Sequence, residues 1–206
     1  DLDYDKNWLV VDVNHNQDNN LPGYAAQICA PKRISTYIPA HLPYRRWEFI
    51  LLEGETKEEM LKTVNFLNNI LPTDKPRYLM GVGKPEDILR GVSLGIDLFD
   101  CVIPTRNARN GQLFTWTGRL NILNSKFTNE LFPISEDCNC YTCCTFSRAY
   151  IRHLFKLNDV LALHLATIHN VTFYLDLMSK IRYEIGQESF TDWSKVILPD
   201  LIRSSD

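Results

Sequence analysis

The amino-acid sequence predicts an α/β fold built on a parallel sheet. Between residues 45 and 104, short apolar runs that suit buried strands alternate with amphipathic segments that suit helices. The connections are short, and glycine or proline closes most of the runs. Strands that alternate with helices are joined by right-handed crossovers and pair in parallel. Such units build either an open doubly wound sheet or a closed barrel.

The composition of the chain is that of a globular protein of one domain or slightly more. It has 206 residues, 45% of them hydrophobic and 23% charged, with a net charge of −3. Apolar runs such as "VLALHLATI" are too short to cross a bilayer, and the acidic opening "DLDYDKNW" does not resemble a secretory signal. We therefore expect a cytoplasmic protein. A start at Asp1 rather than Met is typical of a piece of a longer protein.

The first elements are predicted from turn and cap signals. The segment "LVVDVNHNQDNNLPGY" suits a short strand that runs into a polar turn, and "RRWEFILLEG" suits a strand that ends at Gly54. The following segment, "TKEEMLKTVNFLNNI", has apolar residues at helical spacing. Thr56 as N-cap with Glu59 three residues later predicts a capping box at the start of this helix.

The next three elements repeat the same alternation. The run "PRYLMGVGK" predicts a buried strand that is closed by glycines. The segment "PEDILRGVSLG" predicts a helix, because it opens with proline and two acids and ends at Gly95. The run "IDLFDCVIP" predicts another short buried strand, which Pro104 terminates.

The character of the sequence changes after Pro104. Asn110–Gly111 and Thr117–Gly118 are turn signals between β-prone runs, so they predict a small antiparallel excursion. From "TFSRAYIRHLF" onward the pattern is helical, with breaks expected near Asn158 and Asn170. The tail "SFTDWSKVILPDLIRSSD" predicts one short helix and a frayed end.

Four of the six cysteines lie in the seven residues "CNCYTCC", and their spacing predicts a metal site. Three thiolates in one turn can converge on Zn²⁺, and an imidazole 25 residues further along can complete a tetrahedron. The ligands would be Cys138, Cys140, Cys143 and His169. Such a closed site is structural and holds one zinc ion per chain. Disulfides or plain buried thiols are the alternatives, but closely spaced cysteines make poor bridges.

The remaining thiols and histidines near this cluster are weaker candidates. Cys144 points away from its neighbour and suits packing or an unused thiol. Cys29 and Cys101 suit core positions. His164 lies five residues before the histidine of the cluster, so the two face different sides of a helix.

A carboxylate at a strand end is the second candidate site. Asp97 and Asp100 lie three residues apart on the last predicted strand, so they point to opposite faces. Chemistry in parallel sheets occurs at the carboxyl ends of strands, where Asp100 lies. Arg106 and Arg109 follow closely, and residues 101–157 are more basic than their acidic flanks. These features suit a phosphate-facing surface, but a turn or cap aspartate beside ordinary surface charge fits them as well.

Long stretches of the chain strongly resemble the tRNA-guanine transglycosylases. They are "YLMGVGKPED", "GIDLFDCVIPTRNARNGQLFTWTGRLNI", "CNCYTC", "SRAYIRHL" and "TIHN". The resemblance covers roughly residues 54–195. It implies exchange of guanine at the anticodon wobble position of tRNA for a queuosine precursor or queuine. It also implies an α/β fold, the C-terminal part of a (β/α)₈ TIM barrel with a zinc-binding insertion and C-terminal helices.

The resemblance also implies roles for individual residues. Asp100 matches the catalytic nucleophile, which holds the tRNA as a covalent ribosyl ester in a double displacement. Met80 and Gly81 match the base pocket, and Tyr78 shares the face of Met80. Glu55 lies in "GETKEEM", which resembles a segment that follows the base-binding loop.

Contacts to partners follow from the same resemblance. Arg106 and Arg109 match the basic residues beside the tRNA backbone. The matched zinc ligands are the same four residues that the spacing indicates. Members of this family commonly dimerise through the zinc region, so a homodimer is expected.

The resemblance ends before residue 54. Phe49 and Ile50 stand where the family has a glycine pair, and Asp18 in "HNQDNN" has no neighbouring serine or glycine of the kind that accompanies the second catalytic aspartate. Three strands cannot close an eight-stranded barrel. We expect a partial transglycosylase sequence. A degenerate copy and a non-catalytic partner subunit that binds tRNA through a zinc-stabilised fold are the alternatives.

The expected organisation therefore has four parts. Residues 1–53 are a divergent or unrelated segment, and residues 54–104 supply the last β/α units of the barrel. Residues 105–195 form the zinc-binding subdomain with C-terminal helices, and residues 196–206 form a tail.

Overall fold

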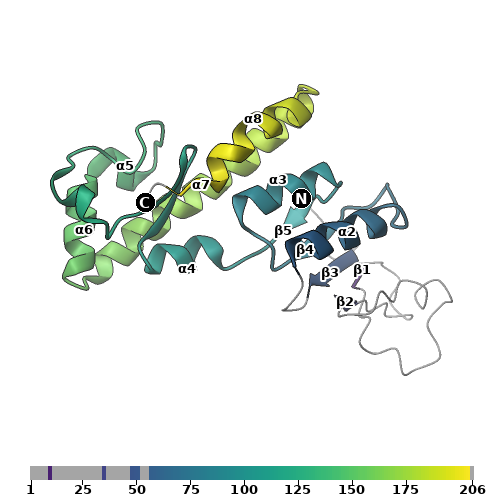
Figure 1. Cartoon of the computed structure of the whole chain (residues 1–206), viewed down its shortest axis with the longest axis horizontal. Helices are drawn as coiled ribbons and strands as arrows, with labels where there is room; N and C mark the ends of the chain where they lie inside the picture. The colour runs from purple at the N-terminus through teal and green to yellow at the C-terminus, as the bar shows by residue number, and fades with distance from the viewer. Residues whose placement is uncertain (1–8, 11–33, 36–46, 52–55, 205–206) are drawn as a thin grey trace. The chain divides into compact units, whose positions relative to one another are not determined.

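The computed structural model describes residues 9–10, 34–35, 47–51 and 56–204 (Figure 1). The chain divides into two compact units. They are Asp1–Gly83 with Arg90–Cys101, and Lys84–Leu89 with Val102–Asp206.

The first unit contains a sheet whose core strands are parallel. Strands β1 (Leu9–Val10), β3 (Trp47–Leu51), β4 (Tyr78–Met80) and β5 (Leu98–Phe99) pair in that order, all in parallel. Strand β2 (Ile34–Ser35) pairs with β3 in the antiparallel sense. The parallel pairing of the three strands that follow one another through helices confirms the alternation predicted between residues 45 and 104.

Helix α2 (Lys57–Asn68) connects β3 to β4 and begins with the predicted capping box. The Thr56 side chain accepts a hydrogen bond from the Glu59 backbone, and the Glu59 carboxylate accepts one from the Thr56 N–H. The helix buries Val64 and Leu67, which belong to the same hydrophobic cluster as Leu79 of β4. The apolar face of α2 therefore forms the core of this unit.

Helix α3 (Pro85–Ser93) leads to β5 and spans the boundary between the units. Gly95 follows it with φ of +85°, a left-handed conformation that favours glycine. A Cβ at Gly91 would lie 2.8 Å from the Phe99 ring, so the helix and β5 approach each other closely here. The sequence "LRGVSLG" therefore predicted the end of the helix correctly.

A buried arginine ties the elements of the first unit together. Arg77, which precedes β4 and is 8% exposed, donates from its guanidinium to the Leu71 carbonyl at 3.2 Å and to the Asn68 side chain. Its backbone N–H donates to the Asp97 carboxylate at 2.8 Å. The Asn68 amide also donates to the Leu94 carbonyl. The network joins α2, the start of β4 and the start of β5.

The second unit is mainly helical. Residues 103–109 form a helix, where the sequence predicted only an antiparallel excursion, because Pro104 lies in a first helical turn and needs no N–H partner there. The Thr117–Gly118 turn does join two antiparallel strands, as predicted. The elements are α4 (Ile103–Arg109), β6 (Gln112–Thr115), β7 (Gly118–Asn121), the 3₁₀ helix η1 (Ser125–Asn129), α5 (Tyr141–Thr145), α6 (Arg148–Lys156), α7 (Val160–Gly186) and α8 (Phe190–Ile202).

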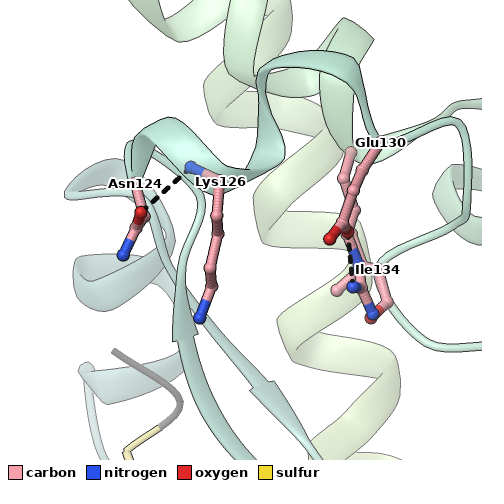
Figure 2. Close-up of polar contacts among 5 residues, drawn as sticks. Asn124, Lys126, Glu130 and Ile134 are labelled. Carbon is pink, nitrogen blue, oxygen red and sulfur yellow. Dashed lines mark hydrogen bonds and ion pairs between the residues drawn. The ribbon is translucent and has the colours of Figure 1, made fainter.

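Side chains hold the irregular segment around η1. Asn124 caps η1 by accepting a hydrogen bond from the Lys126 N–H at 3.1 Å (Figure 2). Arg148, at the start of α6, donates to the Glu130 carboxylate at 2.8 Å and to the Ile134 carbonyl at 2.9 Å. Glu130 and Ile134 are labelled in the same view (Figure 2). The segment before the cysteine cluster is thus anchored to α6.

Helix α7 is the central element of the second unit, where it packs against α4, α5, α6 and β6 (Figure 1). The predicted break near Asn158 is confirmed, because Asn158 has φ of +54° between α6 and α7. The break predicted at Asn170 is wrong: α7 runs unbroken for 27 residues, and Asn170 is fully buried in it. Helix α8 has 13 residues and is longer than the short tail helix that the sequence suggested.

By length and composition, α7 could cross a membrane, which the short apolar runs of the sequence did not suggest. Core helices of soluble proteins meet the same criterion. The buried residues of α7 include His169, Asn170 and Glu184, and the first two bond through their side chains to backbone groups of β6. Helix α7 is therefore the core helix of its unit. Its partners in the main hydrophobic cluster include Leu113, Leu120, Ile122, Phe127, Ile134, Ile151 and Leu154.

Candidate functional site

Three elements of the second unit bring the cysteine cluster and a distant histidine together. Cys140 is the N-cap of α5, and its sulfur accepts a hydrogen bond from the Cys143 N–H at 3.3 Å. Cys138 precedes this cap in a turn, and His169 lies in the middle of α7. The ligand atoms of Cys138, Cys140, Cys143 and His169 all lie within 4.8 Å of one another.

The distances fit a tetrahedral zinc site. The sulfur atoms lie 3.7, 3.7 and 3.3 Å from the His169 Nδ1 atom, in the order Cys138, Cys140 and Cys143. Typical Zn–S and Zn–N bond lengths at tetrahedral angles place sulfur and nitrogen about 3.6 Å apart. The other ring nitrogen, Nε2, lies 2.8 Å from the Phe114 carbonyl. Donation from Nε2 to this carbonyl leaves Nδ1 free to bind the metal.

The electrostatics of the cluster also favour a cation. The hydrogen bond from the Cys143 thiol lowers the pKa of Cys140 to about 3. Burial disfavours the His169 imidazolium, but hydrogen bonds to Cys138, Cys140 and the Phe114 carbonyl outweigh burial and raise its pKa to about 9. The cysteine sulfurs favour positive charge on the neighbouring His169, and a divalent metal bound among them would supply that charge in place of a proton. The four residues therefore fit a structural Zn²⁺ site.

The other thiols and His164 lie outside this cluster. Among the described cysteines all are free, which speaks against the disulfide alternative. Cys144 is exposed, Cys101 is partly buried and His164 is exposed. Cys29 lies outside the described residues.

In the first unit, Asp100 lies directly after β5 and is exposed. Its carboxylate accepts a hydrogen bond from the Gly81 N–H at 3.0 Å, just beyond the end of β4. Gly81 has φ of +72°, a left-handed conformation that favours glycine. Asp97 makes the equivalent bond at the opposite end of the same strand pair. The two aspartates thus bracket β4 and β5.

The β4–β5 register places the proposed base-pocket residues next to Asp100. Tyr78 pairs with Leu98 and Leu79 with Phe99, so the next step of the register sets Met80 beside Asp100. Leu79 is 1% exposed and faces the core. Alternation along the strand puts Tyr78 and Met80 on the opposite face, where both are partly exposed. The structure therefore brings Met80, Gly81 and Asp100 together at one strand end.

Arg106 and Arg109 lie one turn apart on α4, and both side chains are exposed. They belong to the second unit, whereas Asp100 belongs to the first. Glu55 lies outside the described residues.

The structural role of Asn170 was missed in the sequence analysis. Asn170 was taken as a helix break, yet its side chain makes three hydrogen bonds to backbone groups of other elements. The signal was present in "TIHN", a polar pair inside an otherwise apolar helical pattern.

A family model matches the part of the chain that holds both candidate sites. The family model of queuine tRNA-ribosyltransferase matches residues 51–201. The chain belongs to this family. The region that matches contains the parallel strands β4 and β5, the hairpin and the whole metal cluster.

Curated relatives support the same assignment. The chain is 51% identical over 143 residues to a queuine tRNA-ribosyltransferase of Haemophilus ducreyi, across 69% of this chain and 37% of the relative. It is 53% identical over 140 residues to one of Dehalococcoides mccartyi, across 68% and 36%. It is 54% identical over 134 residues to one of Saccharophagus degradans, across 65% and 36%. The matched part of the chain thus spans little more than a third of the length of these relatives.

Proposed function

We propose that this chain carries the nucleophile and the metal-binding region of a tRNA-guanine transglycosylase. The enzyme exchanges guanine at the anticodon wobble position for a queuosine precursor or queuine. The observation that carries the proposal is the Asp100 carboxylate, exposed at a strand end and oriented by the Gly81 N–H at 3.0 Å. The family membership of residues 51–201 supports it.

Asp100 is the proposed nucleophile of a double displacement. Its carboxylate attacks the ribose C1′ atom, and the bond from C1′ to the guanine nitrogen breaks. Guanine takes the bond electrons and gains a proton from a general acid. The incoming base then loses its ring proton, attacks C1′ and releases the carboxylate, so the anomeric configuration is retained.

The residues around Asp100 suit the recognition of a flat base. The hydrogen bond from the Gly81 N–H at 3.0 Å fixes the direction of the carboxylate. The Met80 thioether offers a soft apolar surface for a purine, and Tyr78 lies on the same face of β4. We propose that Tyr78, Met80, Gly81 and Glu55 contribute to substrate binding.

Arg106 and Arg109 are the proposed contacts to the tRNA backbone. Both are exposed on α4, at a spacing that places them on neighbouring turns. A target base that leaves its stack for the active site exposes the flanking phosphates, which guanidinium groups bind well.

The zinc site is proposed to be structural. Cys138, Cys140, Cys143 and His169 would hold the ion, and four protein ligands leave no open position for substrate. When bound, zinc supplies a crosslink between α5 and the middle of α7. The residues of the site take no part in the bond exchange.

The architecture that we propose is the C-terminal part of a (β/α)₈ barrel with a zinc-binding insertion. Residues 54–104 would supply the last β/α units, and residues 105–195 the zinc-binding subdomain and helices. Residues 1–53 form the divergent segment and residues 196–206 the tail. We further propose a cytoplasmic protein that forms a homodimer through its zinc region.

A second candidate function is a zinc-stabilised tRNA-binding fragment or partner subunit without catalysis. The observation that favours it is the coverage: the matched residues correspond to 36–38% of the relatives. It predicts salt-dependent binding of tRNA without exchange.

The test is incorporation of labelled guanine into tRNA by the 206-residue chain. Incorporation that is lost in Asp100→Asn supports the enzyme, and trapping of a covalent RNA adduct identifies the carboxylate. Binding of tRNA without label or adduct supports the second candidate. Asp97→Asn is the matched control, because it changes an aspartate at the opposite end of the same strand pair.

A further inference from the structure

Asn170 connects three elements of the second unit through its side-chain amide. Its oxygen accepts a hydrogen bond from the Phe114 N–H at 3.1 Å. Its nitrogen donates to the Gln112 carbonyl at 3.0 Å and to the Pro104 carbonyl at 3.0 Å. Gln112 and Phe114 belong to β6, and Pro104 belongs to the first turn of α4. Both amide hydrogens are therefore used, and the side chain is fully buried.

His169, the residue before Asn170, also bonds to strand β6, and it is at the same time one of the four candidate metal ligands. The Nε2 atom of His169 lies 2.8 Å from the Phe114 carbonyl, while its Nδ1 atom faces the three sulfurs. The backbone N–H and C=O of Phe114 are thus bound by two consecutive residues of α7. Any change at the metal site that rotates the His169 ring also acts on β6. Through Asn170 it acts on α4.

We propose that Asn170 is a positioning residue that couples metal binding to the placement of α4. Helix α4 carries Arg106 and Arg109, so the coupling sets where the two guanidinium groups lie for RNA. Only this last consequence rests on the proposed function. The coupling itself runs from the metal site through His169, β6 and Asn170 to α4. It is inferred only from the hydrogen bonds of His169 and Asn170.

The chemistry of these contacts requires an amide at position 170. Asn170→Asp keeps the shape and can still accept from the Phe114 N–H, but it sets a buried carboxylate oxygen against two carbonyl oxygens. Asn170→Ala leaves an N–H and two carbonyls without a side-chain partner in the core. The isosteric Asp variant is the sharper probe, because it keeps the side-chain shape and the acceptor for the Phe114 N–H while it removes both donations.

The matched control is Thr142→Val. The Thr142 hydroxyl is fully buried and donates to the Leu165 carbonyl of α7 at 2.7 Å. This isosteric change also removes a buried hydrogen bond to α7, but Thr142 lies on α5 and its hydroxyl bonds to α7 rather than to α4 or β6. Zinc content of every variant is measured first by elemental analysis.

The first experiment measures amide hydrogen exchange in α4 of the 206-residue chain, with zinc bound and after chelation. In the wild-type chain, chelation should speed exchange at residues 106–110 by about tenfold or more. Asn170→Asp should show this fast exchange with zinc still bound, and chelation should add little. Thr142→Val should behave as the wild type. Unchanged exchange in α4 on chelation, or in zinc-loaded Asn170→Asp, overturns the coupling.

The second experiment measures the salt dependence of binding to a tRNA anticodon stem-loop. Loss of two single-strand phosphate contacts should lower the slope of log K against log salt by about 1.4. Arg106→Gln with Arg109→Gln should produce this drop, and Asn170→Asp should produce a similar one alone. Added to the double arginine variant, Asn170→Asp should have no further effect. A full extra drop in that background would overturn its action through the arginines.

The two experiments separate the proposals. If the arginine variants bind RNA as the wild type does, the tRNA contact of the proposed function is wrong. The exchange experiment then still decides the coupling. If α4 responds to zinc and Asn170→Asp abolishes the response, the coupling holds in either case.

Discussion

The two units of the chain are organised by different kinds of buried polar groups. In the first unit the guanidinium of Arg77, the residue before β4, donates to backbone carbonyls and to the Asn68 side chain. In the second unit, four metal-ligand side chains converge, and the adjacent Asn170 binds two further elements. The first network consists of local ties between neighbouring elements, and the second joins residues far apart in sequence.

The difference also appears in where each unit places its polar groups. In the first unit the bond between Arg77 and Asp97 lies at the start of β4 and β5, whereas the exposed Asp100 carboxylate bonds to the Gly81 N–H at their other end. Among the described residues the hydrophobic cluster of the second unit is larger than that of the first, and the metal-ligand residues join α5 to α7 within it. Four predictions test this comparison, from the largest expected effect to the smallest.

Removal of zinc should affect the second unit alone. A structural zinc site contributes on the order of 10 kcal/mol of binding free energy, so the metal-free unit should lose the order around α5 and unfold at a lower temperature. Cys143→Ser should reproduce the effect of chelation, as measured by zinc content and by far-ultraviolet circular dichroism. Cys144→Ser is the control, because Cys144 is exposed and outside the cluster. Equal loss of zinc in both variants would contradict the ligand set.

Asp100→Asn should lower the rate of base exchange by at least about 10⁴-fold, because the proposed nucleophile is lost. The thermal unfolding midpoint should change little, since Asp100 is exposed and an asparagine can still accept the hydrogen bond from the Gly81 N–H. Steady-state incorporation of labelled guanine measures the rate. Asp97→Asn should retain most of the rate, and a comparable loss in both variants would show that the strand-end geometry is not specific to Asp100.

Arg77→Met should destabilise the first unit by about 2–3 kcal/mol, because buried carbonyl and amide groups lose their donor. Lys62→Met on the exposed face of α2 is the control and should stay within about 0.5 kcal/mol. Urea unfolding followed by exchange of the β4 amides measures the difference. Metal content should be unchanged, and a variant that loses zinc would show that the two networks are not independent.

Thr56→Ala should cost about 1 kcal/mol, since it removes half of the capping box of α2. Thr73→Ala in the exposed segment after α2 is the matched control. The same urea titration resolves the two. No difference between them would show that the α2 N-terminus contributes nothing to the stability of the unit.

Much of the local structure could be predicted from the sequence. The capping box, the alternation of strands and helices and the turn at Thr117–Gly118 all follow from interactions between residues a few positions apart. The cysteine spacing likewise indicated the metal site, because three thiols within one turn must lie close together. The position of Pro104 was misread, since proline ends a strand and opens a helix equally well.

The sequence by itself determined most of the helices and strands, because these depend on local backbone preferences. It also determined the residues of the metal cluster and the position of Asp100 at a strand end, because these follow from the spacing and chemistry of the side chains. Only the tertiary structure decided that α7 continues through Asn170. A buried asparagine in a helix is stable when elements distant in sequence supply its hydrogen-bond partners, here Pro104, Gln112 and Phe114. Those partners come from 56 to 66 residues away along the chain, beyond the reach of any local pattern.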